Sequence, residues 1–279
     1  MKLFQGQSKF MKGNDKFINM PMTFWAAIRL VSQKAGYTEN KKVKIHTIQE
    51  IEKVLFDSNI KIKDKKFSTN DLRKYFEYRA RILNSYVKPR LMDAKKAKKI
   101  FKKLFLKFKP KCPLPLNKQK GKKRKIAYLT CIVNILIEAN LKGLDCNYDP
   151  KELTSIVNGK KLLRVLSRRV DGAFPNIVNP IAIWEIKEYY YTTTFGSRVA
   201  DGVYETQLDG MELTELLNSE GKKVLHYLFV DAYSTWWDKG KSYLCRMIDM
   251  LNMKYVDEIL FGHEVVERLP KLVRKWKKK

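Results

Sequence analysis

Residues 169–187 read RVDGAFPNIVNPIAIWEIK, and this stretch decides the fold that we expect for the chain. From Ile181 onward the residues alternate as in a strand, whose successive side chains point to opposite faces of a sheet. One face carries Ile181, Ile183, Glu185 and Lys187, and the other carries Ala182, Trp184 and Ile186. Pro175 and Pro180 bracket the loop between two short strands. A hairpin folded about the middle of this loop sets Asp171 opposite residue 184, give or take one.

This hairpin brings two carboxylates towards each other. Asp171 and Glu185 on neighbouring strands should repel and destabilise the sheet, unless a divalent cation lies between them. Lys187 lies on the same face as Glu185, roughly 6–7 Å further along the strand. An acid from each strand, with a lysine beside the second acid, is the minimum set for metal-assisted attack of water on a phosphodiester.

Asp171 followed by Glu185-Ile186-Lys187 resembles the motif of the PD-(D/E)XK nuclease superfamily, which includes the type II restriction endonucleases. Val170 stands where that family has its proline, a position that is commonly degenerate in the family. The resemblance implies an α/β (mixed α+β) fold, with a restriction-endonuclease-like core in which helices flank a central mixed sheet. It also implies catalytic roles for Asp171, Glu185 and Lys187, and Mg²⁺ as the cofactor, for which Mn²⁺ can substitute.

In this family an acid on the helix ahead of the first strand often joins the metal site. Glu138 is the candidate for that position here, so the resemblance implies a metal held by Asp171, Glu185 and Glu138. The alternative for Glu138 is a surface-facing glutamate at the end of a helix. Gln207 lies where some family branches place a polar active-site residue. Met211 stands where the RecB-like branch has a tyrosine, which disfavours that branch.

The charge of the chain is strongly asymmetric. The formal net charge is +28, from 57 Lys and Arg against 29 Asp and Glu. Residues 1–125 hold 35 of these basic residues and 9 of the acidic ones, whereas residues 126–279 hold 22 and 20. The first half is therefore expected to meet a polyanion. Nucleic acid is favoured over a membrane surface because many aromatic residues are interleaved with the charges and no lipidation signal is present.

The composition excludes several classes of protein. Hydrophobic residues make up 44% and aromatic residues 12%, which are globular values rather than those of a disordered chain. Four cysteines stand far apart without a C-x-x-C pair, which argues against a zinc site or a disulfide framework. The sequence shows no signal peptide, and its most apolar run, residues 126–141, is too short to span a bilayer. We expect a cytoplasmic protein without a membrane partner.

Hydrophobic periodicity predicts a helical first half. Helices are expected at 23–34, from Thr47, at 71–89, at 95–109 and at 126–141, with a short strand at 60–62. Three prolines and the basic stretch 117–125 predict a linker, so we divide the chain into 1–115 and 116–279. The first part is a basic, mainly helical DNA-binding region, either winged-helix-like or a helical cap that does not read sequence. The second part is the nuclease-like core.

The second half alternates between strands and helices. After the hairpin, strands are expected at 188–195, 223–233 and 258–261, and helices at 199–217, with a break at Gly210, and at 242–251. Four residues flank the hairpin strands and are candidates for DNA or phosphate binding: Arg168, Arg169, Ser197 and Arg198. Pairing with nearby carboxylates is the alternative role for the arginines.

The leading hypothesis is a Mg²⁺-dependent endodeoxyribonuclease that resembles a type II restriction enzyme and cuts double-stranded DNA at a specific sequence. By analogy, such an enzyme acts as a homodimer and has a companion DNA methyltransferase for the same sequence. Two alternatives stay open. One is a non-catalytic nucleic-acid-binding protein whose acids are structural, and the other is a repair or junction-resolving nuclease of the same fold.

Overall fold

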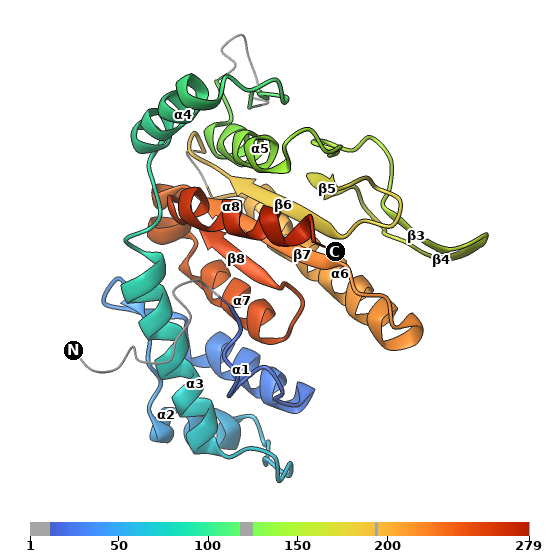
Figure 1. Ribbon diagram of the computed structural model, residues 1–279. Coiled ribbons are helices and arrows are strands. Elements are labelled where there is room, and N and C mark those ends of the chain that lie inside the picture. The colour runs from blue at the N-terminus through green and yellow to red at the C-terminus, as the bar shows by residue number, and fades with distance from the viewer. Residues whose placement is uncertain (1–11, 118–124, 193–194, 279) are drawn as a thin grey trace.

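A four-stranded mixed sheet forms the centre of this α/β fold (Figure 1). Its strands, in spatial order, are β5 (Gly172–Phe174), β6 (Ala182–Glu188), β7 (Leu225–Asp231) and β8 (Glu258–Phe261). β5 is antiparallel to β6, whereas β6, β7 and β8 are parallel to one another. The computed structural model describes residues 12–117, 125–192 and 195–278.

Helices cover both faces of this sheet, so the sequences of the parallel strands are largely apolar. The chain crosses from β6 to β7 through α6 (Ser197–Glu220) and from β7 to β8 through α7 (Lys241–Asn252). Both helices pack on one face, where Ile183 and Leu228 contact them. The other face is covered by α5 (Tyr128–Leu141) and α8 (Glu264–Trp276). We call these the α6 face and the α5 face.

Alternation along β6 therefore separates polar from aromatic side chains, as the sequence predicted. Trp184 lies on the α5 face, where its ring stacks on that of Trp276 with centroids 5.7 Å apart and planes 9° apart. Glu185 and Lys187 lie on the α6 face. Helix α5 is buried nearly all round, which confirms the prediction for 126–141.

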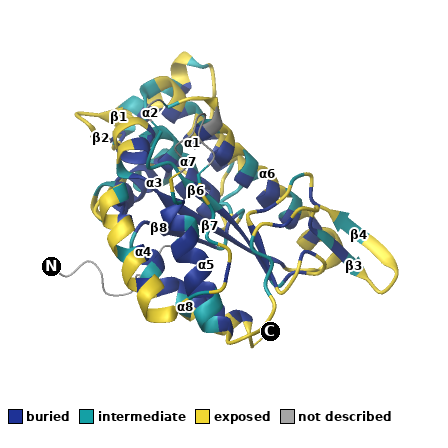
Figure 2. Ribbon diagram, turned by 90° about the horizontal axis from the view of Figure 1, so that it is seen from above, coloured by how far each residue is buried: buried dark blue, intermediate teal, exposed yellow. Residues whose placement is uncertain are grey.

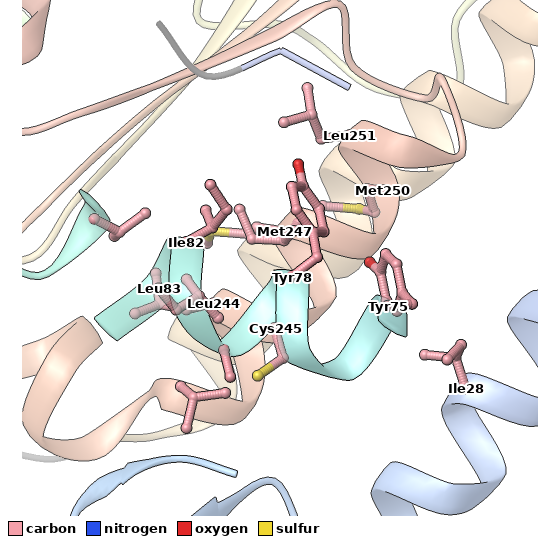
Figure 3. Packing of buried hydrophobic residues seen from close by; sticks show 14 of the residues in the cluster. Ile28, Tyr75, Tyr78, Ile82, Leu83, Leu244, Cys245, Met247, Met250 and Leu251 are labelled. Atoms are coloured by element: carbon pink, nitrogen blue, oxygen red, sulfur yellow. The ribbon is translucent and has the colours of Figure 1, made fainter. Parts of the chain in front are cut away.

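The N-terminal helices are α1 (Met22–Ala35), α2 (Ile48–Asp57) and α3 (Thr69–Arg81), with a small hairpin of β1 (Thr38–Glu39) and β2 (Lys42–Val43) between the first two. Reciprocal capping boxes, Thr47 with Glu50 and Ser68 with Asp71, fix where α2 and α3 begin. A π-helical segment, Ile82–Val87, continues α3. Figure 3 shows how tyrosines of α3 pack against the apolar face of α7.

Three further elements complete the fold. Helix α4 (Ala94–Phe108) packs on α5, although the sequence analysis grouped it with the N-terminal region. A second π-helical segment, Ser234–Lys239, follows β7 and buries Trp236 and Trp237. The hairpin of β3 (Ser155–Asn158) and β4 (Lys161–Val165) projects away from the sheet and was not predicted (Figure 2). Most of the predicted linker, residues 118–124, lies outside the described residues.

Three predicted features are wrong. Residues 60–62 form no strand, because the amide of Ile60 bonds the carbonyl of Leu55 and closes the end of α2. The strand predicted at 188–195 stops with β6 at Glu188, and a turn follows; residues 193–194 lie outside the described ones. Helix α6 is unbroken at Gly210, where a Cβ would lie 2.4 Å from the carbonyl oxygen of Tyr255. Gly210 therefore serves close packing rather than a break.

In the described part of the chain, no helix combines the length and the apolar character that crossing a membrane requires.

A buried ion pair ties the N-terminal helices to the sheet domain. Arg79 of α3 lies 3.1 Å from the carboxylate of Asp249 on α7, and both side chains are almost fully buried. The Tyr75 hydroxyl donates to the same carboxylate, and Arg79 donates to the Ser32 hydroxyl at 2.9 Å. A buried charge without its partner is costly, so this network selects one way of docking α3 against α7.

Replacing Asp249→Asn should lower the free energy of unfolding by about 3–5 kcal/mol, because Arg79 would keep a buried charge without a counter-charge. Urea denaturation measures this loss. Glu77→Gln is the control, because it breaks an exposed ion pair with Arg73 on the same helix α3 and should cost less than about 1 kcal/mol. Equal losses in the two variants would contradict a docking role for the Arg79–Asp249 pair.

Candidate active site

The pairing of β5 with β6 places Asp171 beside Glu185. Gly172 pairs with Trp184, so the next residue pair outward is Asp171 with Glu185, within one residue of the predicted register. The amide of Asp171 donates to the Trp184 carbonyl at 3.1 Å. The Asp171 carboxylate in turn accepts the amide of Ile186 at 2.7 Å. The side chain of Asp171 is therefore fixed against the strand that carries Glu185 and Lys187.

Glycine at position 172 is what allows this close approach. A Cβ added to Gly172 would lie 2.1 Å from the indole ring of Trp184, closer than any real contact. Any larger residue would push β5 away from β6. Asp171 thus supplies the carboxylate, and Gly172 leaves room for the indole ring of Trp184.

Glu185 and Lys187 form a buried pair on the α6 face. Glu185 is 0% exposed and Lys187 is 5% exposed. The Lys187 amine lies 2.7 Å from one Glu185 oxygen and 3.2 Å from a carboxylate oxygen of Glu205 on α6. Although burial alone would raise it, the charges of Lys187 and Arg168 hold the pKa of Glu185 below its ordinary value. Glu185 is therefore ionised at neutral pH.

Arg168 joins the carboxylates of β6 and α6. Its guanidinium lies 2.9 Å from Glu185, 2.7 Å from Asp209 and 3.4 Å from Glu205. Despite the opposing effect of burial, these acids raise the pKa of Arg168 above its ordinary value. From the sequence, phosphates or nearby carboxylates were the expected partners of Arg168, and the structure places it among carboxylates.

The site contains more acid than base. Four carboxylates, those of Asp171, Glu185, Glu205 and Asp209, face two cations, Arg168 and Lys187. Burial and the charge of Glu185 raise the pKa of the fully buried Asp209 to about 7. The crowding of protein atoms and the same charge raise the pKa of Asp171 to about 7, although this residue keeps access to solvent. Near neutral pH, protonation of Asp171 and Asp209 therefore reduces the net negative charge of the site.

The residues present fit a hard divalent cation such as Mg²⁺, which takes carboxylate oxygens and usually keeps several waters. Asp171 and Glu185 supply carboxylates from adjacent strands, and Oδ1 of Asp209 is buried without a hydrogen bond from the described residues. Within residues 12–117, 125–192 and 195–278, no three His, Cys, Asp or Glu residues are arranged as a complete metal cage. A metal here would thus be held by two carboxylates of the chain and would take its other ligands from outside the protein, rather than occupy an all-protein site.

Other predicted site residues lie elsewhere. Glu138 accepts the amide of Lys111 at 3.0 and 3.1 Å and belongs to α5, on the opposite side of the sheet, so its position does not support a metal role. Arg169 is exposed next to Arg168, and Ser197 is exposed at the start of α6. The side chain of Arg198 lies outside the described ones. Gln207 contacts the sulfur of Met211 at 3.8 Å.

Sequence reasoning missed Glu205 and Asp209. They stand four residues apart on α6 and so share one face of the helix. The sequence does contain that spacing, but α6 carries other acids as well, and only the packing of α6 on β6 distinguishes this pair.

Glu188 provides a contrast on the same strand. Its carboxylate accepts the amide of Thr130 at 3.0 Å and the Thr130 hydroxyl at 3.2 Å, near the N-terminus of α5. Burial raises the pKa of Glu188 to about 7, because no basic side chain pairs with it among the described residues. The pKa values of the two glutamates of β6 are therefore shifted in opposite directions, because, in the part of the chain that the structure describes, Glu185 has cations beside it and Glu188 does not.

Comparison with protein families places the site within one segment. A family model described as a domain of unknown function (DUF7687) matches residues 92–276, from α4 to α8. A second model, described as a domain of unknown function (DUF7690), matches residues 11–86, which include α1, α2 and α3. Neither a curated protein nor a solved structure matches the chain. Every residue of the candidate site falls within the first match.

The raised pKa of Glu188 predicts a pH dependence of stability. Between about pH 4.5 and 7 the folded chain keeps a proton on Glu188 that the unfolded chain has lost, so stability falls as pH rises through this window. The slope from one proton is at most about 1.4 kcal/mol per pH unit. Glu188→Gln should flatten this decline in urea denaturation measured from pH 4.5 to 7.5. The exposed Glu152→Gln control should not, and an unchanged slope for Glu188→Gln would contradict the assignment.

Proposed function

We propose that this chain, which belongs to the family described as a domain of unknown function (DUF7687), is a metal-dependent nuclease that hydrolyses phosphodiester bonds in DNA. The observation that carries the proposal is the position of Asp171, Glu185 and Lys187 on two paired strands, with the last two buried against each other. Two facing carboxylates can hold a metal that activates water, and a lysine beside one of them can orient that water.

Each residue has a defined task in this proposal. A bound Mg²⁺ lowers the pKa of a water ligand and stabilises charge on the scissile phosphate. Asp171 and Glu185 would hold it. The charges of Glu185 and Asp171 raise the pKa of Lys187 in spite of its burial, so its amine stays protonated. Lys187 therefore orients the attacking water and stabilises developing negative charge, rather than removing a proton.

Arg168 holds the carboxylates together when no substrate is present. Its guanidinium contacts three of them, and its side chain is 22% exposed, so one edge is accessible to solvent. A guanidinium in this position can also bind a phosphate oxygen, because phosphate and carboxylate accept hydrogen bonds from the same planar group.

The finer proposal is a type II restriction enzyme that cuts double-stranded DNA at a specific sequence. The motif on β5 and β6 supports it by resemblance, and the concentration of positive charge in residues 1–125 supports a DNA partner. A homodimer and a companion methyltransferase acting on the same sequence belong to this proposal by analogy alone.

A non-catalytic nucleic-acid-binding protein is the second candidate. It is favoured by the fact that Arg168 and Lys187 already pair with Glu185, as in a purely structural ion network. In that case the ion network would only hold α6 on β6, and the basic residues of 1–125 alone would bind nucleic acid.

Glu185→Gln should abolish cleavage of supercoiled plasmid in the presence of Mg²⁺, with a loss of at least about a hundredfold, because the metal loses a charged ligand. EDTA should stop cleavage by the wild-type chain, and Mn²⁺ should restore it. Glu188→Gln is the matched control, since it makes the same change on the same strand but on the other face of the sheet, and it should keep its activity.

Two results would contradict the nuclease proposal. One is a wild-type chain that binds plasmid but does not cut it with Mg²⁺ or Mn²⁺, which would favour the non-catalytic candidate. The other is cleavage that persists unchanged in Glu185→Gln, which would place any activity at a different site.

A map of cut positions on a sequenced plasmid tests the restriction-enzyme proposal. We expect a small set of fixed cuts that share one short sequence, because a restriction enzyme discriminates through base contacts. Cuts scattered over the plasmid, or confined to branched and damaged DNA, would contradict it and favour a repair or junction-resolving nuclease.

A further inference from the structure

A groove lies between α4 and α8, on the side of the sheet opposite the candidate active site. Its cavity has a volume of about 550 Å³ and includes Ile100 and Leu104 from α4 and Val266 from α8. Both helices belong to the apolar cluster of the α5 face, whereas Glu185 and Lys187 contact α6. The sheet therefore separates the groove from the carboxylates.

One wall of the groove is a row of lysines on α4. This helix contains seven lysines and no acid. Lys96, Lys103 and Lys107 line the groove, and their spacing of seven and four residues places them on one stripe of the helix. The stripe extends over roughly 16 Å, at about 1.5 Å per residue. Arg90 adds a further cation to the lining.

The acids of the groove already have partners. Glu264 is buried and accepts hydrogen bonds from the Tyr86 hydroxyl and the Phe261 amide. Glu267 pairs with Lys271 one turn along α8, at 3.7 Å. In contrast, none of the ion pairs among the described residues includes Lys96, Lys103 or Lys107. Lys96 contacts Nδ1 of His263 at 3.3 Å. Three lysines and Arg90 thus line the groove against two acids, which leaves it with a net positive charge.

Exposed apolar side chains cluster at the C-terminal end of the same helix. Phe105 is 41% exposed, Phe108 is 37% exposed and Leu106 is 75% exposed. None of these three side chains lines the groove, so its assignment rests on the basic wall. A positively charged groove that follows the phosphates is a feature of sites that bind single-stranded nucleic acid. A cavity of this volume has the size of a small-ligand pocket, so it can take part of a single strand rather than the full width of a duplex.

We propose that the groove between α4 and α8 binds a single-stranded segment of nucleic acid, with its phosphates along Lys96, Lys103 and Lys107. The inference rests on the proposed function only in taking nucleic acid as the partner. It needs neither the metal nor cleavage, because the groove and the carboxylates lie on opposite faces of the sheet.

Two triple variants on one helix test this proposal. The groove variant is Lys96→Gln, Lys103→Gln and Lys107→Gln. The control variant is Lys95→Gln, Lys98→Gln and Lys102→Gln, which removes the same charge from exposed lysines of α4 that do not line the groove. Fluorescence anisotropy of a labelled twelve-nucleotide single strand, in EDTA, measures affinity at several salt concentrations. Circular dichroism checks that both variants are folded.

We expect the groove variant to bind the single strand at least about tenfold more weakly than wild type, and the control variant to stay within about threefold. Three lost phosphate contacts should also reduce the slope of log affinity against log salt by about 2. Equal weakening in both variants, or no weakening in either, would overturn the proposal. Because EDTA prevents metal-dependent cleavage, these outcomes are independent of the plasmid-cutting result for Glu185→Gln.

Discussion

The pairing of Glu185 with Lys187 and Arg168 is the interaction on which the arrangement of the site depends. A carboxylate withdrawn completely from water costs several kcal/mol unless cations and hydrogen bonds compensate it. Lys187 from the same strand and Arg168 from the segment after β4 provide that compensation. Because Arg168 also contacts Glu205 and Asp209, the same pairing fixes α6 against β6. The position of Asp171 then follows from the hydrogen bonds between β5 and β6.

Strand β6 gives the two sides of the molecule different chemistry. Charged groups meet α6 on one face, and a stack of tryptophans meets α8 on the other. The lysine row of α4 lies beyond that second face, so the structure separates a compact acidic site from an extended basic groove. The Arg79–Asp249 pair joins the N-terminal helices to this framework through α7.

Local patterns in the sequence predicted much of this framework. The alternation from Ile181 to Lys187 gave the two faces of β6, and the prolines around the loop gave a register correct to within one residue. The start of α3 was predicted to within two residues, at 71 against Thr69, because helix starts depend on capping residues that are close in the chain. The hairpin of β3 and β4 was missed, because most of its residues face solvent and its apolar pattern is weak.

The site itself was predictable only in part, for a physical reason. Asp171, Glu185 and Lys187 lie on paired strands, where sequence spacing determines neighbours. The contributions of Glu205 and Asp209 depend instead on how α6 rotates against the sheet, which is a tertiary packing choice. Glu138 has a suitable charge and precedes the hairpin, yet α5 packs on the wrong face for it to contribute.

The most direct measurement is a titration of the wild-type chain with Mn²⁺, followed by electron paramagnetic resonance without nucleic acid. We expect saturable binding of the ion that is lost in Asp171→Asn and in Glu185→Gln but retained in Glu188→Gln. Binding that is absent in the wild type, or unchanged when Glu185 is replaced, would contradict a metal held between β5 and β6.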